Sequence, residues 1–441
     1  METTADEARE TIEAKEASTA GQTSAKRELS VADGLYILVV LAAAVMRLTN
    51  LGSIPLSPRE ALEALAAFQF LQTGPNLIAT GSPAYLALTS FLIPFLGVSD
   101  STARLVPLIF GLGLVILPWL LRDRLGQIGA LVAAALFAVS PLFSAASRTA
   151  GGDAIALFAI CLLFIAALRL RDSGADRWLY TLGSAVGLGL ASSPLIYSGL
   201  LTLAAAYFAQ RLFTAKSEQN YQPERAKIIK AAILGGLILI MLSTRIFTHL
   251  SGFGAATQIL GDWLGQFSLQ GDLQTLLSPF LILARYEVVL LPLGIFAIIW
   301  ANWRNHPMGT VLTYWLLAGM ILIMLQRGVF NNALLIPLAG YLLLGLASNR
   351  LLQHGRNRWT WAVTGLIVLL GAIVLVNVAR FLRVSLVEQQ VANLWITLMA
   401  FAAVALIIYY FWAEHEKSIF QGLWLGVLIL LLFYQRGSSR P

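Results

Sequence analysis

Residues 126–158 read GQIGALVAAALFAVSPLFSAASRTAGGDAIALF, an apolar run that ends at Ser140-Pro141, crosses a polar turn and re-enters apolar sequence. The turn carries two ionisable residues, Arg148 and Asp153. Such residues are costly so close to hydrocarbon, and binding or catalysis at the lipid boundary is the usual reason for them. The stretch therefore predicts two membrane spans joined by a charged hairpin at one membrane face. The alternative is a solvated turn without chemistry.

The composition of the whole chain supports a polytopic membrane protein. Of its 441 residues, 58% are hydrophobic and 12% are charged, and the mean hydropathy is +0.76, which lies outside the range of soluble globular proteins. The single cysteine, Cys161, excludes a disulfide framework and a cysteine-based metal site. The net charge of +7 does not indicate a nucleic-acid partner, because cations in a membrane protein sort by side and set its orientation.

Windows of about 19 apolar residues predict about thirteen membrane helices. They lie near residues 33–50, 103–121, 126–144, 152–170, 178–192, 195–213, 227–248, 279–300, 308–326, 330–347, 359–379, 391–412 and 417–434. Residues 84–97 form a shorter apolar stretch that contains Pro94, and we expect it to dip into the membrane without crossing.

The N-terminal residues 1–30 mix Glu, Ala, Thr and Lys without a core-forming pattern or a cleavable signal, so we expect a disordered tail. With this tail in the cytoplasm all lysines fall on the inner side, and the outer cations are all arginines. We therefore expect a cytoplasmic N-terminus, a main transmembrane module over residues 31–350 and further transmembrane helices over residues 351–441.

Two long loops then lie outside the membrane. In the loop of residues 50–102, Ser57 and Glu60 have the spacing of a capping box, and Leu62, Leu65, Ala66 and Phe68 to Phe70 follow with helical spacing. This pattern predicts a helix that lies in the outer interface with those apolar residues toward lipid. The second loop, residues 249–278, is long and rich in Gly and Gln, and we expect a lid over the first.

The amino-acid sequences of these segments resemble those of the membrane glycosyltransferases of the GT-C fold. Within that superfamily it is most similar to the protein O-mannosyltransferases and aminoarabinose transferases, and more distantly to the catalytic subunit of oligosaccharyltransferase. The matching residues are Ser101 to Gly113 (STARLVPLIFGLG), Ser140-Pro141, Ser147-Arg148, Ala150-Gly151, Asp153 and Gln326-Arg327. The sequence departs from the pattern at two positions: Arg59 stands before Glu60 where the family has its catalytic Asp, and Ala154 stands where a second acidic residue follows Asp153.

The resemblance implies an all-α membrane enzyme, in a bacterial plasma membrane, that takes a sugar from a polyprenyl-phosphate carrier. Its catalytic carboxylate would be Glu60 or Asp153. The substrate-binding residues would be Arg59, Arg148, Arg245, His249 and Arg327, because arginine suits bidentate contact with phosphate. A divalent metal is compatible with the resemblance, but Ala154 removes its second acidic ligand, so no residue is assigned to metal binding. The expected partners are membrane lipid and the lipid-linked sugar.

Two other interpretations stay open at this point. Arg59 is compatible with a catalytically degenerate relative that binds lipid-linked sugar or scaffolds a membrane complex. A lipid or sugar transporter or flippase is the second alternative, although transporters often carry charges near the membrane midplane and these spans are nearly free of central charge. Hexosyl or pentosyl transfer remains the activity that we expect.

Overall fold

In the computed structural model, the part of the chain that the structure describes is built from helices and their connections. It comprises residues 30–72, 81–213, 224–244, 252–267, 273–304, 306–326, 329–352, 360–369, 399, 418 and 420–433. The elements are α2 (Val31–Leu48), α3 (Pro58–Gln72), α4 (Pro83–Leu96), α5 (Asp100–Ile116), η1 (Leu117–Leu121), α6 (Arg122–Leu125), α7 (Gln127–Val139), α8 (Pro141–Arg148), α9 (Asp153–Ser173), α10 (Asp176–Leu190), α11 (Leu195–Phe213), α12 (Arg225–Ser243), α13 (Gly252–Gly265), α14 (Leu273–Tyr286), α15 (Leu290–Trp303), α16 (Pro307–Leu325), η2 (Phe330–Leu334) and α17 (Leu335–Leu352). The expected all-α membrane fold is confirmed.

Six helical segments of the described residues are long and apolar enough to cross a membrane, and the bent pair of α7 and α8 makes a seventh. The six are Val31–Leu48, Asp100–Leu125, Asp153–Ser173, Arg225–Ser243, Pro307–Leu325 and Phe330–Leu352. The expected span near 391–412 lies outside the described residues apart from Met399, and those near 359–379 and 417–434 are described in part. The total of about thirteen therefore stays a prediction.

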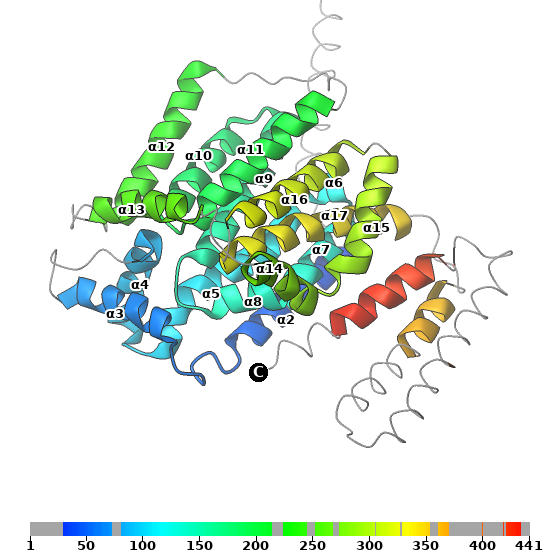
Figure 1. The fold of residues 1–441 in the computed structure, drawn as a ribbon, viewed down its shortest axis with the longest axis horizontal. Coiled ribbons are helices and arrows are strands. Elements are labelled where there is room, and N and C mark those ends of the chain that lie inside the picture. Colours follow the sequence, from blue (N-terminus) through cyan, green and yellow to red (C-terminus); the bar gives the residue numbers. More distant parts are fainter. Residues whose placement is uncertain are drawn as a thin grey trace, which may run out of the picture.

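The core of the molecule is centred on α17, which packs against α7, α15 and α16 (Figure 1). In the segment Phe330–Leu352, which includes α17, 89% of the residues in an apolar 18-residue window are buried. Gly129 of α7 and Gly345 of α17 bring the two backbones together, because a methyl group on Gly129 would lie 2.7 Å from the carbonyl oxygen of Gly345. Gly183 and Gly187 of α10 come even closer to α12, because a methyl group on either would collide with a backbone carbonyl oxygen of that helix. Such glycines allow close packing between membrane helices.

The bend between α7 and α8 measures 59° and falls at Ser140-Pro141. Proline cannot continue the helix that precedes it, and the Ser140 hydroxyl accepts a hydrogen bond from the backbone N–H of Phe143. The Ser140 hydroxyl also donates to the buried carboxylate of Glu287 at 2.6 Å, and Tyr341 donates to the other carboxylate oxygen. Glu287 lies between α14 and α15, so two helices stand where the sequence predicted one span over 279–300.

Arg47, in the last turn of α2, is 1% exposed and has no role at the membrane surface. Its guanidinium donates to the carbonyl oxygens of Phe137 and Ala138 at 3.0 Å and to the Ser147 hydroxyl at 3.1 Å. The two carbonyls end α7, where a helix leaves backbone acceptors without partners and carries partial negative charge. Arg47 thus joins α2 to α7 and α8 as a structural cation.

At one edge of the bundle, α3 and α4 lie against each other, and α13 contacts α4 (Figure 1). The capping box at the start of α3 is confirmed, since Ser57 N–H donates to Glu60 at 2.9 Å. Leu62 and Leu65 are 66% and 50% exposed, as a lipid-facing side requires. The same expectation is wrong for Ala66, which is buried, and for Phe68, which packs against the cluster of Tyr85 and Ala67.

Helix α4 has 14 residues with Pro94 inside it, which agrees with a segment that dips without crossing. The expected lid, residues 249–278, contains α13, whose Trp263 donates a hydrogen bond to the Ser198 hydroxyl of α11 at 2.9 Å. The stretch is therefore a helix docked on the bundle over 252–265, and its motion as a lid stays a prediction.

Candidate functional site

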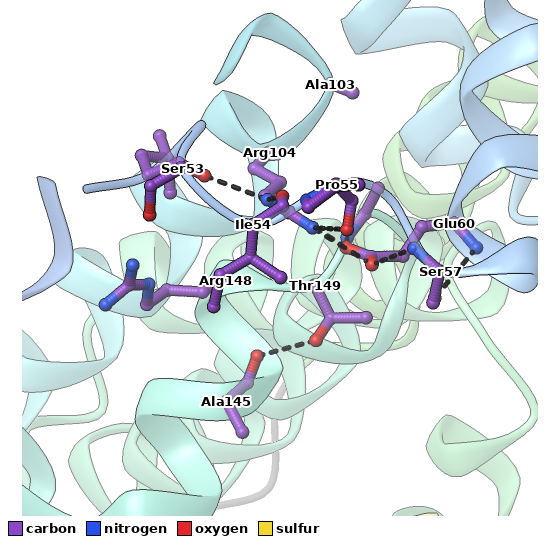
Figure 2. Close-up of polar contacts among 12 residues, drawn as sticks. Ser53, Ile54, Pro55, Ser57, Glu60, Ala103, Arg104, Ala145, Arg148 and Thr149 are labelled. Carbon is purple, nitrogen blue, oxygen red and sulfur yellow. Dashed lines mark hydrogen bonds and ion pairs between the residues drawn. The ribbon is translucent and has the colours of Figure 1, made fainter. Parts of the chain in front are cut away.

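Glu60, which the sequence predicted as a catalytic carboxylate, lies in a buried ion pair with Arg104 of α5. The two side chains are joined by hydrogen bonds of 3.0 and 3.1 Å, and their residues are 6% and 5% exposed. Figure 2 shows Arg104 inserted between the 53–55 segment and Glu60. Arg104 also donates to the carbonyl oxygens of Leu51 and Ile54. The pair therefore fastens the start of α3 and the segment before it to α5.

The carboxylate of Glu60 accepts four hydrogen bonds, which fill its acceptor positions. Two come from Arg104, one from the backbone N–H of Ser57 at 2.9 Å and one from that of Ala150 at 3.0 Å. Burial alone would raise the pKa of Glu60, but these bonds outweigh it and hold the pKa at about 2. A carboxylate with so low a pKa is a poor base, and this one has no free oxygen to offer. The predicted catalytic role of Glu60 is not supported by this geometry.

Glu63, one turn further along α3, has the opposite surroundings. Its side chain is partly buried, and its Oε2 is shielded from solvent without a hydrogen-bond partner among the described residues. The carboxylate lies between two backbone segments, because a methyl group on Gly81 would be 3.4 Å from its Oε2 and one on Gly151 would be 3.6 Å from its Oε1. Burial first, and then the negative charge of Asp153, raise the pKa of Glu63 to about 7, against the attraction of Arg59 and a hydrogen bond from the backbone of Ser82.

Asp153, the second predicted catalytic residue, begins α9 and lies close enough to Glu63 for their charges to interact. Its Oδ2 accepts a hydrogen bond from the Asn331 side chain of η2 at 2.6 Å, and the Ser193 side chain also bonds to it. The residue before it must be glycine, since a side chain on Gly152 would collide with the Ser192 carbonyl and the Ser82 hydroxyl. This close approach places α9, the turn before α11 and the start of α4 around one carboxylate.

Arg59 is exposed at the start of α3, and its positive charge acts on both Glu63 and Asp153. The structure therefore brings together three charged groups from α3 and α9: Arg59, Glu63 and Asp153. We refer to these three residues as the acid–arginine cluster. It combines a carboxylate that has a free oxygen with a cation that a phosphate can reach.

Amide side chains continue from this cluster into the bundle. Asn332 follows Asn331 in η2, and its amide donates to Gln326 at 2.7 Å and to Gln266, after α13, at 3.3 Å. Gln326 is fully buried, accepts a further hydrogen bond from Ser198, and its amide NH₂ group has no partner in the described part of the chain. Amides with free hydrogen-bonding capacity are groups that suit the hydroxyls of a sugar.

The predicted phosphate ligands have different outcomes. Arg148 is partly exposed, and one of its nitrogens donates to the backbone carbonyls of Thr49 and Asn50 at 3.1 and 3.0 Å. These partners carry no net charge, so they leave the positive charge of Arg148 available to an anion. Figure 2 shows its guanidinium pointing away from Glu60. Arg245, His249 and Arg327 lie outside the described residues.

The donor set is a poor fit for a divalent metal ion. Ca²⁺ takes six to eight oxygen ligands, and Mg²⁺ is usually held by one or two carboxylates together with several waters. The cluster offers two carboxylates, one of which is already bound by Asn331, and places the positive charge of Arg59 beside them. In the described part of the chain, no group of three or more His, Cys, Asp or Glu side chains could hold a metal ion.

The sequence predicted Glu60, and not Glu63, as a catalytic carboxylate. The signal that separates them is the capping-box spacing from Ser57, which assigns Glu60 to the helix start and leaves Glu63 without a local partner. The roles of Arg104 and Asn331 carried no local signal, because their carboxylate partners lie 44 and 178 residues away in the chain.

Comparison with known proteins gives matches in sequence and in fold. Residues 80–244 match the model of the dolichyl-phosphate-mannose-protein mannosyltransferase family. The fold is similar to that of ArnT from Cupriavidus metallidurans bound to undecaprenyl phosphate, at 14% identity and a TM-score of 0.57 over 92% of this chain and 77% of that one. The apo state of ArnT from the same organism is similar at 14% identity and a TM-score of 0.56, over 93% of this chain and 77% of that one.

A weaker similarity connects the chain with the Archaeoglobus fulgidus oligosaccharyltransferase in complex with Zn and sulfate. The identity is 15% and the TM-score is 0.48, over 76% of this chain and 55% of that one. This score is too low to support any argument about shared structure. A search among proteins of curated function gave no significant match.

Proposed function

Because the chain has the GT-C fold that its sequence led us to expect, we propose that it is a glycosyltransferase that moves a sugar from a polyprenyl-phosphate carrier to an acceptor at the outer face of the membrane. The observation that carries this proposal is the acid–arginine cluster at the junction of α3 and α9. Glycosyl transfer needs a carboxylate near the acceptor and cations near the departing phosphate, which gains charge as the glycosidic bond breaks. The cluster offers both kinds of group.

The choice of carrier rests on the similar proteins. The ArnT structure holds undecaprenyl phosphate, and the family model is named for a dolichyl-phosphate-linked mannose. Both are polyprenyl monophosphates, which supports a donor of that class for this chain. The positive-inside pattern favours a cytoplasmic tail, and on that orientation we propose that the cluster lies at the outer face of a bacterial plasma membrane.

Asp153 provides the direct test of the proposal. Purified protein in liposomes should release polyprenyl phosphate from a labelled polyprenyl-phosphate sugar and pass the label to an acceptor fraction. Asp153→Asn should lower the transfer rate by roughly 10- to 100-fold, because it removes one negative charge of the acid–arginine cluster without changing the shape of the side chain. Asp262→Asn, at an exposed carboxylate of α13, is the matched control and should keep the wild-type rate. Equal rates in Asp153→Asn and wild type would contradict the role of this cluster.

Arg148 should bind the carrier phosphate, since its charge is not neutralised by Thr49 and Asn50. Losing one charge-assisted contact costs about 1.5–3 kcal/mol, so Arg148→Met should weaken undecaprenyl phosphate binding by roughly 10- to 150-fold. The control is Arg225→Met, at an exposed arginine at the start of α12. An unchanged dissociation constant in Arg148→Met would assign Arg148 to anchoring at the interface instead.

Arg59 stands where the similar transferases have their catalytic Asp, and this favours one other function. The protein would then be a catalytically degenerate relative that binds lipid-linked sugar or scaffolds a membrane complex. That function predicts donor binding without release of polyprenyl phosphate in the assay above. A transporter or flippase predicts movement of intact donor between leaflets, which the same liposomes would reveal. Release of polyprenyl phosphate together with transfer of the label excludes both.

A further inference from the structure

We infer that Glu63 is the general base of the transfer reaction and that it takes the proton from the nucleophilic hydroxyl or amine of the acceptor. This inference rests on the proposed function and names the group that performs its proton transfer. The reaction would be a single displacement. The acceptor heteroatom forms a bond to the anomeric carbon of the sugar, its proton passes to Glu63, and the anomeric carbon–oxygen bond breaks with its electron pair remaining on polyprenyl phosphate.

The first argument is position along α3. Residues four apart on a helix lie within about 40° of each other around the axis and about 6 Å apart along it, whereas neighbouring residues differ by about 100°. Glu63 is four residues after Arg59, so it lies on the same side of α3, toward Asp153. Glu60 follows Arg59 directly and turns toward Arg104 instead. The side of α3 that faces α9 therefore still carries a carboxylate, one turn further along.

The second argument is that the surroundings of Glu63 do not stabilise an ionised carboxylate, as they would if the residue had only a structural role. A buried carboxylate is stabilised by a close cation and by hydrogen bonds to both oxygens, as Glu60 is. Glu63 has an Oε2 that is shielded from solvent and has no described partner, and Asp153 repels it. Groups arranged in this way are frequent at active sites, because a poorly stabilised anion binds a proton more readily. The raised pKa of Glu63 agrees with that reading.

The third argument compares the other carboxylates near the cluster. The oxygens of Glu60 are filled by four hydrogen bonds. Asp153 is held by Asn331 and Ser193, so it is fixed in place for orienting substrate and for keeping Glu63 basic. Glu63 is left as the carboxylate with an oxygen free to accept a proton. Arg59, exposed beside it, is placed to attract the phosphate of the donor.

The test is a set of three proteins in the liposome transfer assay: wild type, Glu63→Gln, and the double variant Arg59→Asp with Glu63→Gln. Glu63→Gln keeps the size of the side chain and removes the base, so transfer should fall at least 100-fold. The double variant restores a carboxylate one turn earlier on the same side of α3, and its rate should exceed that of Glu63→Gln at least 10-fold. Thermal unfolding of each purified variant is measured in parallel, together with undecaprenyl phosphate binding.

Each outcome decides a different statement. Transfer by wild type that persists in Glu63→Gln would overturn the role of Glu63 and leave the proposed function standing. No transfer by wild type, with or without binding of undecaprenyl phosphate, would overturn the proposed function and the base together. Loss of transfer in Glu63→Gln caused by unfolding would also overturn the inference, because an amide in place of a carboxylate whose Oε2 has no described partner should not destabilise the fold.

Discussion

Glu60→Gln should lower the free energy of unfolding by about 3–5 kcal/mol, which is the usual cost of leaving one partner of a buried ion pair without the other. Arg104 would keep its charge, 5% exposed, opposite a neutral amide. The amide nitrogen would also face the N–H group of Ser57 or Ala150, and two donors cannot bond to each other. The start of α3 would then separate from α5.

The measurement is the midpoint of denaturation in detergent solution, read by tryptophan fluorescence. Glu224→Gln is the matched control, because Glu224 is an exposed helix-start carboxylate whose ion pair with Lys227 should contribute less than about 1 kcal/mol. The double replacement of Glu60 and Arg104 by Leu and Met should be milder than either single change, since it removes both charges. A Glu60→Gln protein of wild-type stability with no transfer activity would return Glu60 to a catalytic role.

The six long apolar spans of the described residues, the helix end at Ser140-Pro141 and the start of α3 could be predicted because each depends on residues that are close in sequence. Ser140-Pro141 ends one helix and caps the next, and Ser57 with Glu60 forms a capping box, whatever surrounds them. The lipid-facing side of α3 was predicted only in part. An amphipathic pattern identifies Leu62 and Leu65 as apolar, but the packing of α4 decides that Ala66 is covered.

The candidate site could not be predicted fully, because its chemistry depends on contacts between distant segments. Asp153 was identified from its place in the charged hairpin, yet its partner Asn331 lies 178 residues later. The capping-box spacing sets Glu60 apart from Glu63 in the sequence, but the bonds from Arg104 to Glu60 alone could not be read from it. A tertiary contact therefore determines which carboxylate is structural and which has a free oxygen.

Glu63 should make the activity and the stability of the protein depend on pH in opposite directions. Its pKa in the folded protein is about 7, whereas its ordinary value is 4.5. A base acts only when ionised, so kcat/KM should rise about tenfold per pH unit below pH 7 and level off above it. Between pH 4.5 and 7 the folded protein binds more protons at this site than the unfolded chain does, so stability should fall as pH rises through that window.

Glu60 contributes the opposite slope in a separate window. Its folded pKa of about 2 lies below its ordinary value of 4.5, so its contribution to stability is complete above pH 4.5 and is lost as pH falls toward 2. Unfolding midpoints measured from pH 4.5 to 8 therefore report Glu63 without interference from Glu60. Glu63→Gln should flatten the slope in this window and be about 1–3 kcal/mol more stable than wild type at pH 8.

The neighbours of Glu63 allow the pH profile to be assigned to this residue. Asp153→Asn removes a negative charge that raises the pKa of Glu63, so the midpoint of the residual activity should move to lower pH. Arg59→Gln removes a positive charge that lowers the pKa, so its midpoint should move to higher pH. Rate profiles from pH 5 to 9 in the liposome assay would measure both shifts. If the pH midpoint of the rate profile is the same in wild type and both variants, a group other than Glu63 controls the rate.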